Sequence, residues 1–365
     1  MIGAWIMLDK AIFSRLMRVR GACKLSAQSI MKIVCTYGLT AHQRQTIEQS
    51  VPGAEIRDRT CRSSEETIEL MRGGCDVLIA FRIPDDPIRH APGLKWVQLL
   101  SAGADRALRG PLKDLALPIT TASGIHATPI AEYIIASILA WSHRFHVTMR
   151  AQLRRQWIRQ GEFMATVDEV RGKTIAILGY GSIGREAARL AEPFALRVLA
   201  LKRDPASRRD PGWVPKGLGD PEGRIPERWF GPADREAVLS ASDFIAVTLP
   251  LTRETAGFVG ARELAAMKPD AYLVNIARGK VIDQAALVDA LAKKRIGGAG
   301  LDVFEREPLE PESALWDMDN VILTPHIAGA NRGYMDKASE LIAENLRRFA
   351  AGMPLLNRVD PELGY

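Results

Sequence analysis

Cysteine is scarce in this sequence, and the few that occur do not suggest a disulfide scaffold. The four cysteines are Cys23, Cys35, Cys61 and Cys75. None forms a Cys-x-x-Cys pair and no histidine cluster accompanies them, so we expect free thiols and no bound metal. A reducing, cytoplasmic location follows as the expectation.

Long hydrophobic runs are absent as well. The longest apolar stretch, residues 130–141, is interrupted by Glu132 and is too short to cross a bilayer. The sequence therefore predicts no membrane association.

A strong excess of charge of one sign is also lacking. The 365 residues carry 49 Lys and Arg against 43 Asp and Glu, a net charge of +6. Residues 1–32 alone carry +5, so the remainder of the chain is nearly neutral. Without a dense basic stripe, we expect no nucleic-acid partner.

Residues 1–30 form a basic N-terminal extension that we leave out of the fold. Its apolar part precedes its basic part, which is the wrong order for a secretory signal. We expect a disordered extension or an upstream start, with an Arg-rich transit peptide as the alternative.

What is present is an ordinary globular composition, 47% hydrophobic and 25% charged, in a length that predicts two domains. In the first part, a helix is expected over 42–50, ended by Pro52-Gly53. The strands predicted there are 32–37, 76–80, 96–100 and 119–121. This alternation is typical of a parallel sheet.

A second α/β region follows a long apolar helix, predicted over 130–149 and opened by Pro129. Its six predicted strands are 174–178, 197–201, 244–249, 272–276, 300–303 and 321–323. Six strands with helices between most of them fit a doubly wound nucleotide-binding domain. Residues 204–232 are rich in Pro, Gly and Arg, and are expected to be an inserted surface loop. The helical segment 332–352 is a candidate to return to the first domain.

A glycine motif points to a dinucleotide. The residues Gly179-Tyr180-Gly181-Ser182-Ile183-Gly184 follow one predicted strand and open a helix. In this context Gly179 permits a tight turn, Gly181 leaves room for a pyrophosphate, and Gly184 lets helix and strand pack closely. The helix N-terminus then offers free N–H groups to the phosphates.

The end of the next predicted strand indicates which dinucleotide is used. NAD-binding chains place an acid about 20 residues beyond the motif, on the ribose diol. Lys202 and Arg203 stand there instead, and a Lys-Arg pair attracts a 2′-phosphate. We therefore favour NADP over NAD; the alternative is that Arg203 stacks on the adenine while NAD is still accepted.

Three ionisable residues follow the carboxyl ends of later predicted strands, where doubly wound sheets bind ligands. They are Arg278, Glu307 and His326. Each alone is most simply a surface charge or a structural residue. Together, on a nucleotide-binding fold, they are candidate catalytic groups.

The motifs around these residues resemble the D-isomer-specific 2-hydroxyacid dehydrogenase family, from about residue 31 to the late 350s. The matching segments are the glycine motif, Leu249-Pro250-Leu251-Thr252 with Thr255, Asn275-Ile276-Ala277-Arg278-Gly279, Asp302-Val303-Phe304-Glu305-Arg306-Glu307-Pro308 and Pro325-His326-Ile327-Ala328-Gly329. Within the family, the chain resembles glyoxylate/hydroxypyruvate reductases and phosphoglycerate dehydrogenases.

The resemblance implies two doubly wound parallel-sheet domains, a Rossmann dinucleotide-binding domain inserted in a flavodoxin-like substrate domain. The implied boundaries are 31–125 plus 330–358 for the substrate domain and 126–329 for the dinucleotide domain. A homodimer formed through the dinucleotide domain is implied too.

The resemblance also assigns roles to the three ionisable residues. His326 would exchange a proton with the substrate oxygen, because a histidine side chain titrates near neutrality. Glu307 would bond the other ring nitrogen and favour the protonated ring. Arg278 would clamp the substrate carboxylate and polarise its carbonyl.

Further contacts are implied for cofactor and substrate. The cofactor set comprises Gly179, Tyr180, Gly181, Ser182, Ile183, Gly184, Lys202, Arg203, Leu249, Pro250, Thr255, Ile276, Ala277, Asp302 and Gly329. Asp302 would contact the nicotinamide carboxamide; a structural strand-end acid is the alternative. Ala102 and Gly103 would offer backbone N–H groups to the substrate carboxylate, unless their segment is an ordinary turn. Phe81 and Arg82 are candidates for substrate selection, whereas His126 is not expected to be catalytic.

The expected activity is hydride transfer between NAD(P)H and a small 2-keto acid of the glyoxylate or hydroxypyruvate type. Formate is disfavoured, because formate dehydrogenases of this fold carry Gln where this chain has Glu307. A phosphite-type dehydrogenase is compatible with the three residues. A dinucleotide-sensing corepressor is the alternative from another class, and the end at Gly364-Tyr365 without a low-complexity tail counts against it.

Overall fold

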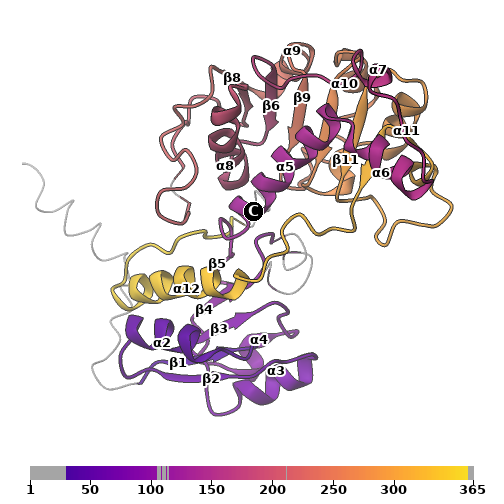
Figure 1. The fold of residues 1–365 in the computed structure, drawn as a ribbon. Coiled ribbons are helices and arrows are strands. Elements are labelled where there is room, and N and C mark those ends of the chain that lie inside the picture. Colours follow the sequence, from indigo (N-terminus) through magenta and orange to yellow (C-terminus); the bar gives the residue numbers. More distant parts are fainter. Residues whose placement is uncertain (1–29, 105–107, 109–111, 113–114, 211, 361–365) are drawn as a thin grey trace, which may run out of the picture.

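The computed structural model describes residues 30–104, 108, 112, 115–210 and 212–360, which form two α/β bodies, one above the other (Figure 1). Each body is built on one sheet, and every ladder in both sheets is parallel. This confirms the predicted fold class. The predicted N-terminal extension lies, apart from residue 30, outside the described residues.

The first sheet has the order β2-β1-β3-β4-β5, the flavodoxin-like arrangement. Its strands are β1 (Lys32–Cys35), β2 (Glu55–Asp58), β3 (Val77–Ala80), β4 (Trp96–Leu99) and β5 (Ile119–Thr120). The helices that follow the first three are α2 (Ala41–Ser50), α3 (Ser64–Met71) and α4 (Pro87–His90). Helix α2 begins one residue before the predicted start, and it is capped because the Thr40 and Gln43 side chains each accept a bond from the other's backbone N–H.

The C-terminal helix α12 (Tyr334–Ala350) returns to this first sheet. Its Leu341 and Ile342 are buried in one core cluster with Ile33 and Ile47. Gln43 of α2 also donates to Asp336 of α12 at 2.8 Å. The chain therefore leaves the first body and comes back to it.

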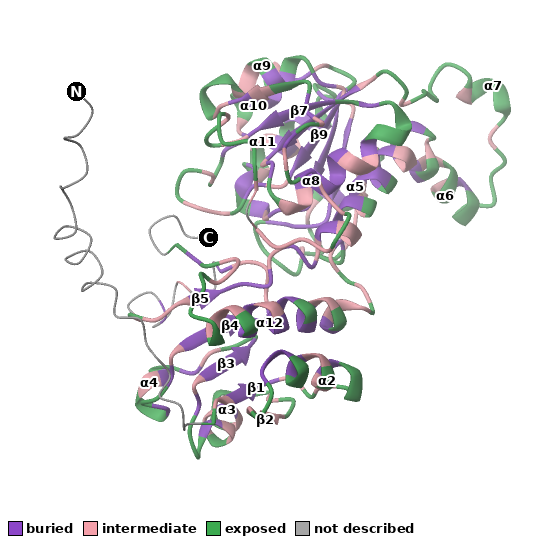
Figure 2. Ribbon diagram, turned by 90° about the vertical axis from the view of Figure 1, so that its left-hand side faces the viewer, coloured by how far each residue is buried: buried purple, intermediate pink, exposed green. Residues whose placement is uncertain are grey.

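The second sheet has the order β12-β11-β10-β9-β6-β7-β8, which contains the Rossmann order around β6. Its strands are β6 (Thr174–Leu178), β7 (Arg197–Leu201), β8 (Arg228–Phe230), β9 (Phe244–Val247), β10 (Tyr272–Asn275), β11 (Gly298–Leu301) and β12 (Val321–Leu323). Most of them are buried on both faces (Figure 2), as their continuous apolar runs predict.

Helices cover both faces of this sheet. One face carries α5 (Ala127–Ser142) and α8 (Ser182–Ala191), and the other carries α9 (Arg235–Ser240), α10 (Ala261–Ala266) and α11 (Gln284–Ala292). Short 3-10 turns lie at Glu192–Phe194, Pro232–Asp234, Gly279–Val281 and Ala314–Trp316. Two further helices, α6 (Phe145–Leu153) and α7 (Gln160–Phe163), extend away from the body as an exposed arm (Figure 2).

The prediction of one helix over 130–149 is wrong at both ends. Helix α5 begins at Ala127, so Pro129 is its third residue, and it ends at Ser142. Arg144 adopts a left-handed conformation (φ 56°) between α5 and α6, and its Nε donates to the Thr166 carbonyl at 2.8 Å. A tertiary contact therefore accompanies this break, which local helix propensity does not reveal.

The predicted strand list is corrected in two ways. Strands β2 and β8 were missed, and β8 lies inside the predicted loop 204–232. Several strands end one or two residues earlier than predicted, because buried apolar residues such as Leu249 and Ile276 continue past the ladder. Predicted strand 300–303 is β11, which begins two residues earlier.

The described residues contain no helix that is both long enough and apolar enough to span a bilayer. Among them, Cys35, Cys61 and Cys75 are free thiols.

Candidate active site

The carboxyl ends of the second sheet's strands all lie at one edge, because the sheet is parallel. That edge receives the glycine turn after β6, Lys202 and Arg203 after β7, Arg278 after β10, Asp302 and Glu307 after β11, and His326 after β12. Strand order reverses beside β6, between β7 on one side and β9 on the other. A crevice at this switch point is where doubly wound sheets bind ligands.

The glycine turn has a geometry that only glycine allows. Gly179 has φ +105°, and a Cβ there would lie 2.9 Å from the Leu249 nitrogen of the neighbouring strand connection. A Cβ at Gly184 would lie 2.6 Å from the Gly179 carbonyl oxygen. At Gly181, the N-cap of α8, a Cβ would meet nothing within 4 Å. The turn is therefore tight on its protein side and open beside the helix N-terminus, which suits a pyrophosphate.

The other three residues of this motif, Tyr180, Ser182 and Ile183, offer their backbone groups to a ligand. Ser182 and Ile183 are the first two residues of α8, whose N–H groups have no partner within the helix. The Tyr180 side chain is buried, and its hydroxyl donates to Asp220 at 2.8 Å. Only the backbone of Tyr180 is left to face a ligand.

The two cations after β7 differ in their surroundings. The Lys202 ammonium donates to the Ser207 carbonyl. Burial, and then the nearby Arg185 charge, lower the pKa of Lys202. Arg203 is exposed. The pKa of Glu254 is lowered first by hydrogen bonds from Thr252 and the backbone, and the charge of Arg203 lowers it further. Arg203 thus lies toward the connection after β9.

His326 and Glu307 form a direct pair. The His326 Nδ1 and the Glu307 Oε2 are 2.7 Å apart. Partial burial raises the pKa of Glu307, but the bond to His326, the Phe304 N–H and the charges of His326 and Arg278 together hold that pKa below its ordinary value. Glu307 is therefore an anion near neutrality and the ring offers it an Nδ1–H.

The backbone of His326 is held in an uncommon conformation. Its φ is 56°, in the left-handed region. The buried Asp302 carboxylate accepts the N–H groups of Ile327 and Ala328, both at 2.8 Å, and the Asp302 carbonyl accepts the His326 N–H at 2.9 Å. A charged acceptor on two successive amides offsets the cost of this backbone.

Thr324 supports the same loop. Its hydroxyl donates to Asp302 at 2.6 Å and accepts from the Tyr133 hydroxyl at 2.7 Å. Burial raises the pKa of Tyr133 to about 12, so it remains a donor. Sequence reasoning gave neither residue a role; the Thr-Pro-His spacing was the only available signal for Thr324.

Arg278 is brought against the Glu307 loop by its neighbour Gly279. A Cβ at Gly279 would lie 1.9 Å from the Phe304 carbonyl carbon, so no other residue fits. Arg278 Nη1 donates to the Ala277 carbonyl at 2.8 Å. Its charge also contributes to lowering the pKa of both Glu307 and His126. Arg278 therefore lies within electrostatic reach of both.

The other predicted cofactor residues lie around the same edge. Leu249, Ile276 and Ala277 are buried, and the Thr255 hydroxyl donates to the Pro250 carbonyl, which closes that loop on itself. The Gly329 carbonyl lies 3.0 Å from the His126 Nδ1. His126, at the N-cap of α5, thus connects the two segments in which the chain crosses between the bodies, near residues 121–127 and 324–334. Burial lowers the pKa of His126.

Tyr334 links the substrate-side candidates to this edge. Its ring stacks on Phe81 with centroids 5.9 Å apart and lies against His126 at 4.9 Å. Its hydroxyl donates to the Leu100 carbonyl, just before Ala102 and Gly103. Phe81 and Arg82 are exposed directly after β3. Sequence reasoning missed Tyr334.

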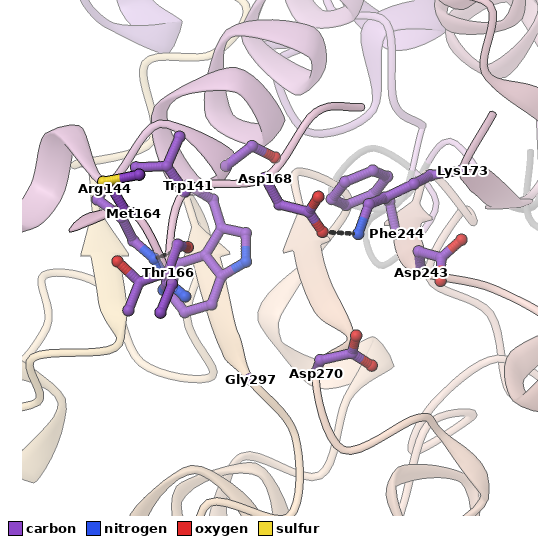
Figure 3. A pocket seen from close by; sticks show the side chains of 13 residues that line it. Trp141, Arg144, Met164, Thr166, Asp168, Lys173, Asp243, Phe244, Asp270 and Gly297 are labelled. Carbon is purple, nitrogen blue, oxygen red and sulfur yellow. Dashed lines mark hydrogen bonds and ion pairs between the residues drawn. The ribbon is translucent and has the colours of Figure 1, made fainter. Parts of the chain in front are cut away.

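A separate cavity of 390 Å³ lies at the opposite edge of the second sheet. Lys173, Asp243, Asp270 and Gly297 line it. Lys173, Asp243 and Gly297 directly precede β6, β9 and β11, and Asp270 lies two residues before β10. Figure 3 shows Lys173 paired with Asp168 there. It shares no residue with the predicted site. Among the described residues, no group of His, Cys, Asp and Glu is arranged to hold a metal ion.

Comparison with known proteins identifies the family. Residues 135–328 match the family model described as "D-isomer specific 2-hydroxyacid dehydrogenase, NAD binding domain". A glyoxylate reductase of Thermococcus gammatolerans is 36% identical over 279 residues, 75% of this chain and 79% of that protein.

Solved structures are similar over most of the chain. A D-isomer specific 2-hydroxyacid dehydrogenase of Xanthobacter autotrophicus in complex with NADPH and MES has a TM-score of 0.73 at 28% identity, covering 93% of this chain and 100% of that one. An NADPH-dependent glyoxylate/hydroxypyruvate reductase of Sinorhizobium meliloti in complex with NADP and sulfate has a TM-score of 0.72 at 26% identity, covering 92% and 100%. This chain belongs to the D-isomer specific 2-hydroxyacid dehydrogenase family. It is an NAD(P)-dependent oxidoreductase.

Proposed function

We propose that this enzyme reduces a small 2-keto acid of the glyoxylate or hydroxypyruvate type to its D-2-hydroxy acid. The observation that carries the proposal is the 2.7 Å pair between Glu307 and a His326 whose loop Asp302 holds in place. The names of the glyoxylate reductase from T. gammatolerans and the reductase from S. meliloti support the substrate class.

His326 carries the proton. Because Nδ1 donates to the Glu307 carboxylate, Nε2 is the ring nitrogen left to face the substrate. In reduction the imidazolium gives its Nε2 proton to the keto oxygen. In oxidation the neutral ring accepts a proton from the hydroxyl, and Glu307 stabilises the cation that forms.

Arg278 binds and polarises the substrate. Its guanidinium presents two parallel donors to a carboxylate and remains charged at any working pH. The N–H groups of Ala102 and Gly103 bind the same carboxylate from the first body, and Phe81 and Arg82 limit the substituent on the 2-carbon. Binding from both bodies excludes water from the reacting atoms when the cleft closes.

The residues at the edge of the second sheet fit a dinucleotide. The open space at Gly181 and the N–H groups at Ser182 and Ile183 hold the pyrophosphate, and Leu249, Pro250, Thr255, Ile276, Ala277, Asp302 and Gly329 surround the remainder. When bound, the nicotinamide supplies or accepts the hydride exchanged with the 2-carbon. The chain's own residues position the substrate and move the proton.

We propose NADP as the preferred dinucleotide. No acid stands directly after β7, and the exposed Arg203 carries a positive charge that attracts a 2′-phosphate. Lys202 adds a second positive charge nearby, and its ammonium donates to the Ser207 carbonyl.

The direct test is a panel of initial rates. NADPH and NADH oxidation is measured with glyoxylate, hydroxypyruvate, pyruvate and a bulky 2-keto acid. Arg278→Ala is expected to lower kcat/KM by about 10²- to 10³-fold, the usual loss for a transition-state donor. Arg306→Ala, an exposed arginine on the Glu307 loop, is the matched control and should retain activity.

The outcomes separate the parts of the proposal. NADPH-preferring turnover of the small acids that collapses in Arg278→Ala supports all of it. Preference for NADH overturns the cofactor assignment alone. Preference for the bulky acid overturns the substrate class, and an active Arg278→Ala enzyme overturns the carboxylate clamp.

We further propose that the chain divides into a substrate domain, 31–125 plus 330–358, and a dinucleotide domain, 126–329.

We also propose that the chain forms a homodimer through the arm of α6 and α7. Large apolar side chains concentrate there, including Phe145, Met149, Leu153, Trp157 and Met164, with Trp157 95% exposed. A groove of 470 Å³ runs along the same helices. Such a patch indicates a protein interface, and a second copy of the chain would cover it.

A further inference from the structure

The segment between β7 and β8, described for residues 204–210 and 212–227, contacts both bodies of the molecule. It leaves the second sheet beside α8 and descends toward the C-terminal stretch of the first body (Figure 1). It is longer than a usual connection between such elements. The cofactor contacts proposed above, Lys202 and Arg203, directly precede it.

The segment is fixed firmly to α8, the helix that follows the glycine turn. Arg185 of α8 is 1% exposed and pairs with Asp210 at 3.2 Å. Its guanidinium also donates to the carbonyls of Asp220 and, at 2.6 Å, Arg208. Buried charges are costly unless paired, so α8 requires this segment as its cover.

A second set of contacts joins the segment to the glycine turn itself. The hydroxyl of Tyr180, the residue after Gly179, donates to Asp220 at 2.8 Å. The same carboxylate accepts the N–H groups of Arg224 and Ile225 at 2.9 and 3.1 Å. The buried Glu186 of α8 accepts the Gly219 N–H at 2.6 Å. Movement of the glycine turn therefore moves the segment.

The tip of the segment is fixed to the first body. Trp213 packs against the core cluster beneath α12. Its backbone N–H donates to Asn357 Oδ1 at 3.1 Å, and Asn357 Nδ2 in turn donates to the Ser123 carbonyl at 2.8 Å. The Trp213 carbonyl lies so close to Gly124 that a Cβ there would be 2.0 Å from the oxygen.

These contacts lie at one of the two segments in which the chain crosses between the bodies. Gly124 lies two residues before His126, whose ring lies 3.0 Å from the Gly329 carbonyl, on the loop that follows His326. The bodies are otherwise joined covalently only through the crossovers near residues 121–127 and 324–334. The segment is thus a third, noncovalent link at the first crossover.

We propose that residues 204–210 and 212–227 form an interdomain strap. Trp213 is its positioning residue. Through Trp213, dinucleotide binding at the glycine turn affects the crossover beside the catalytic loop. The inference rests on the NAD(P) dependence of the family and is independent of the keto acid used. Through the strap, an occupied glycine turn restrains the angle at which the substrate domain meets the catalytic edge.

Hydrogen exchange measured by mass spectrometry tests the strap without any substrate. The full chain is compared with and without saturating NADPH, and again with NADH. In the wild type, dinucleotide should slow exchange in peptides covering 119–127 by roughly 5- to 150-fold, the usual size of coupling between two sites. In Trp213→Ala this protection should be lost, while protection of the glycine turn remains. Trp213→Phe should restore it.

Two further variants complete the experiment. Lys216→Ala changes an exposed residue of the same strap and should behave as the wild type. Tyr180→Phe removes only the oxygen that reaches Asp220, and should weaken protection of 119–127 even if Trp213→Ala does not fold. A purely structural strap would lower stability without changing where dinucleotide slows exchange.

The proposal is overturned if bound dinucleotide leaves 119–127 unprotected in the wild type. It is equally overturned if Trp213→Ala or Tyr180→Phe shows full wild-type protection there. A wrong substrate class would leave all of these exchange results unchanged, so the two failures are distinguishable. Where turnover is measured, Trp213→Ala should raise the KM for the keto acid and leave the dinucleotide Kd unchanged.

Discussion

His326 combines a reactive side chain with a backbone conformation that non-glycine residues seldom adopt. A left-handed residue of this kind costs roughly 1–2 kcal/mol. Asp302 stabilises it through the two amides that follow and through its own carbonyl. The ring is therefore held by the backbone as well as by Glu307, and this places Nε2 where a keto oxygen can be protonated.

Thr324→Val tests this support at the residue scale. The change keeps the shape but removes the bonds to Asp302 and Tyr133, and a lost buried partner costs about 1–3 kcal/mol. We expect a lower Tm and a kcat reduced by up to about 10²-fold, because small misplacements of catalytic groups are costly. Thr324→Ser retains the hydroxyl and should retain both. Equal kcat in Thr324→Val and wild type would contradict the role of Asp302.

Glu307→Gln tests the electrostatics of the pair. The hydrogen-bonded His326 and neighbouring charges hold the pKa of Glu307 low despite its partial burial, so the carboxylate is ionised throughout the working range. Its stabilising effect is present above the ordinary glutamate range and is lost as pH falls through the lowered folded-state pKa. Glutamine cannot stabilise an imidazolium by charge.

For that variant we expect kcat for reduction to fall about 10²- to 10⁴-fold. The alkaline limb of the rate profile should also move to lower pH. Glu310→Gln, an exposed glutamate nearby, serves as control. An unchanged pH profile in Glu307→Gln would mean that the pair is only structural.

The residues of the site were largely predictable because each follows a strongly apolar strand in a recognisable motif. Arg278, Glu307 and His326 all fall at the edge that the motifs indicated. Tyr334 and Tyr133 were not predictable, because their roles arise from contacts with Leu100 and Thr324, which are distant in sequence. A partly buried tyrosine in a helix has no local signature of such a contact.

At the scale of elements, the sequence located every central strand and the edge strands β5 and β12, but it missed the other two edge strands. Strand β2 reads Glu-Ile-Arg-Asp and β8 reads Arg-Trp-Phe, and both lie at sheet edges. Both carry charged residues and have few apolar ones, so apolar patterning does not reveal them. The break between α5 and α6 escaped prediction for a related reason, since Trp141 stacks on His146 across it at 4.8 Å.

His146 gives this stacked element a pH dependence. Burial lowers the pKa of His146 to about 4, below the roughly 6.5 of an unfolded histidine. The unfolded chain therefore binds more protons between these values, and stability falls as pH falls through that window. His146→Phe keeps a ring against Trp141 and cannot be protonated.

We expect the Tm of His146→Phe to fall less than that of the wild type between pH 7 and pH 5. His143→Phe makes the same change at an exposed position and should follow the wild type. Scanning calorimetry at the two pH values measures the difference. Parallel Tm losses in wild type and His146→Phe would show that this histidine does not contribute.

At the scale of the whole molecule, two α/β bodies with sheets of different topology are joined where the chain crosses between them twice. The return of α12 to the first sheet depends on apolar contacts with α2 that link residues far apart in sequence, so the sequence could only suggest it. The arm of α6 and α7 extends from the other body and leaves its apolar side chains exposed. Coverage of these side chains by a second copy is the simplest way to remove them from water.

Trp157→Glu tests the homodimer. A charge in the centre of the apolar patch should convert a dimer to a monomer in light scattering at micromolar concentration. Trp316→Glu introduces the same charge at an exposed tryptophan outside the arm and should leave the dimer intact. A monomeric wild type, or a dimeric Trp157→Glu protein, would contradict the assignment of this surface.

The most direct test of the proposed catalysis compares wild type with His326→Gln. The initial rate of NADPH and NADH oxidation is measured with glyoxylate and hydroxypyruvate at pH 7, with dinucleotide binding measured on the same samples. We predict turnover by the wild type and a kcat about 10²- to 10⁴-fold lower in His326→Gln, with dinucleotide still bound. Similar turnover by both proteins, or no turnover by a wild type that binds the dinucleotide, would contradict the proposal that His326 protonates a small 2-keto acid.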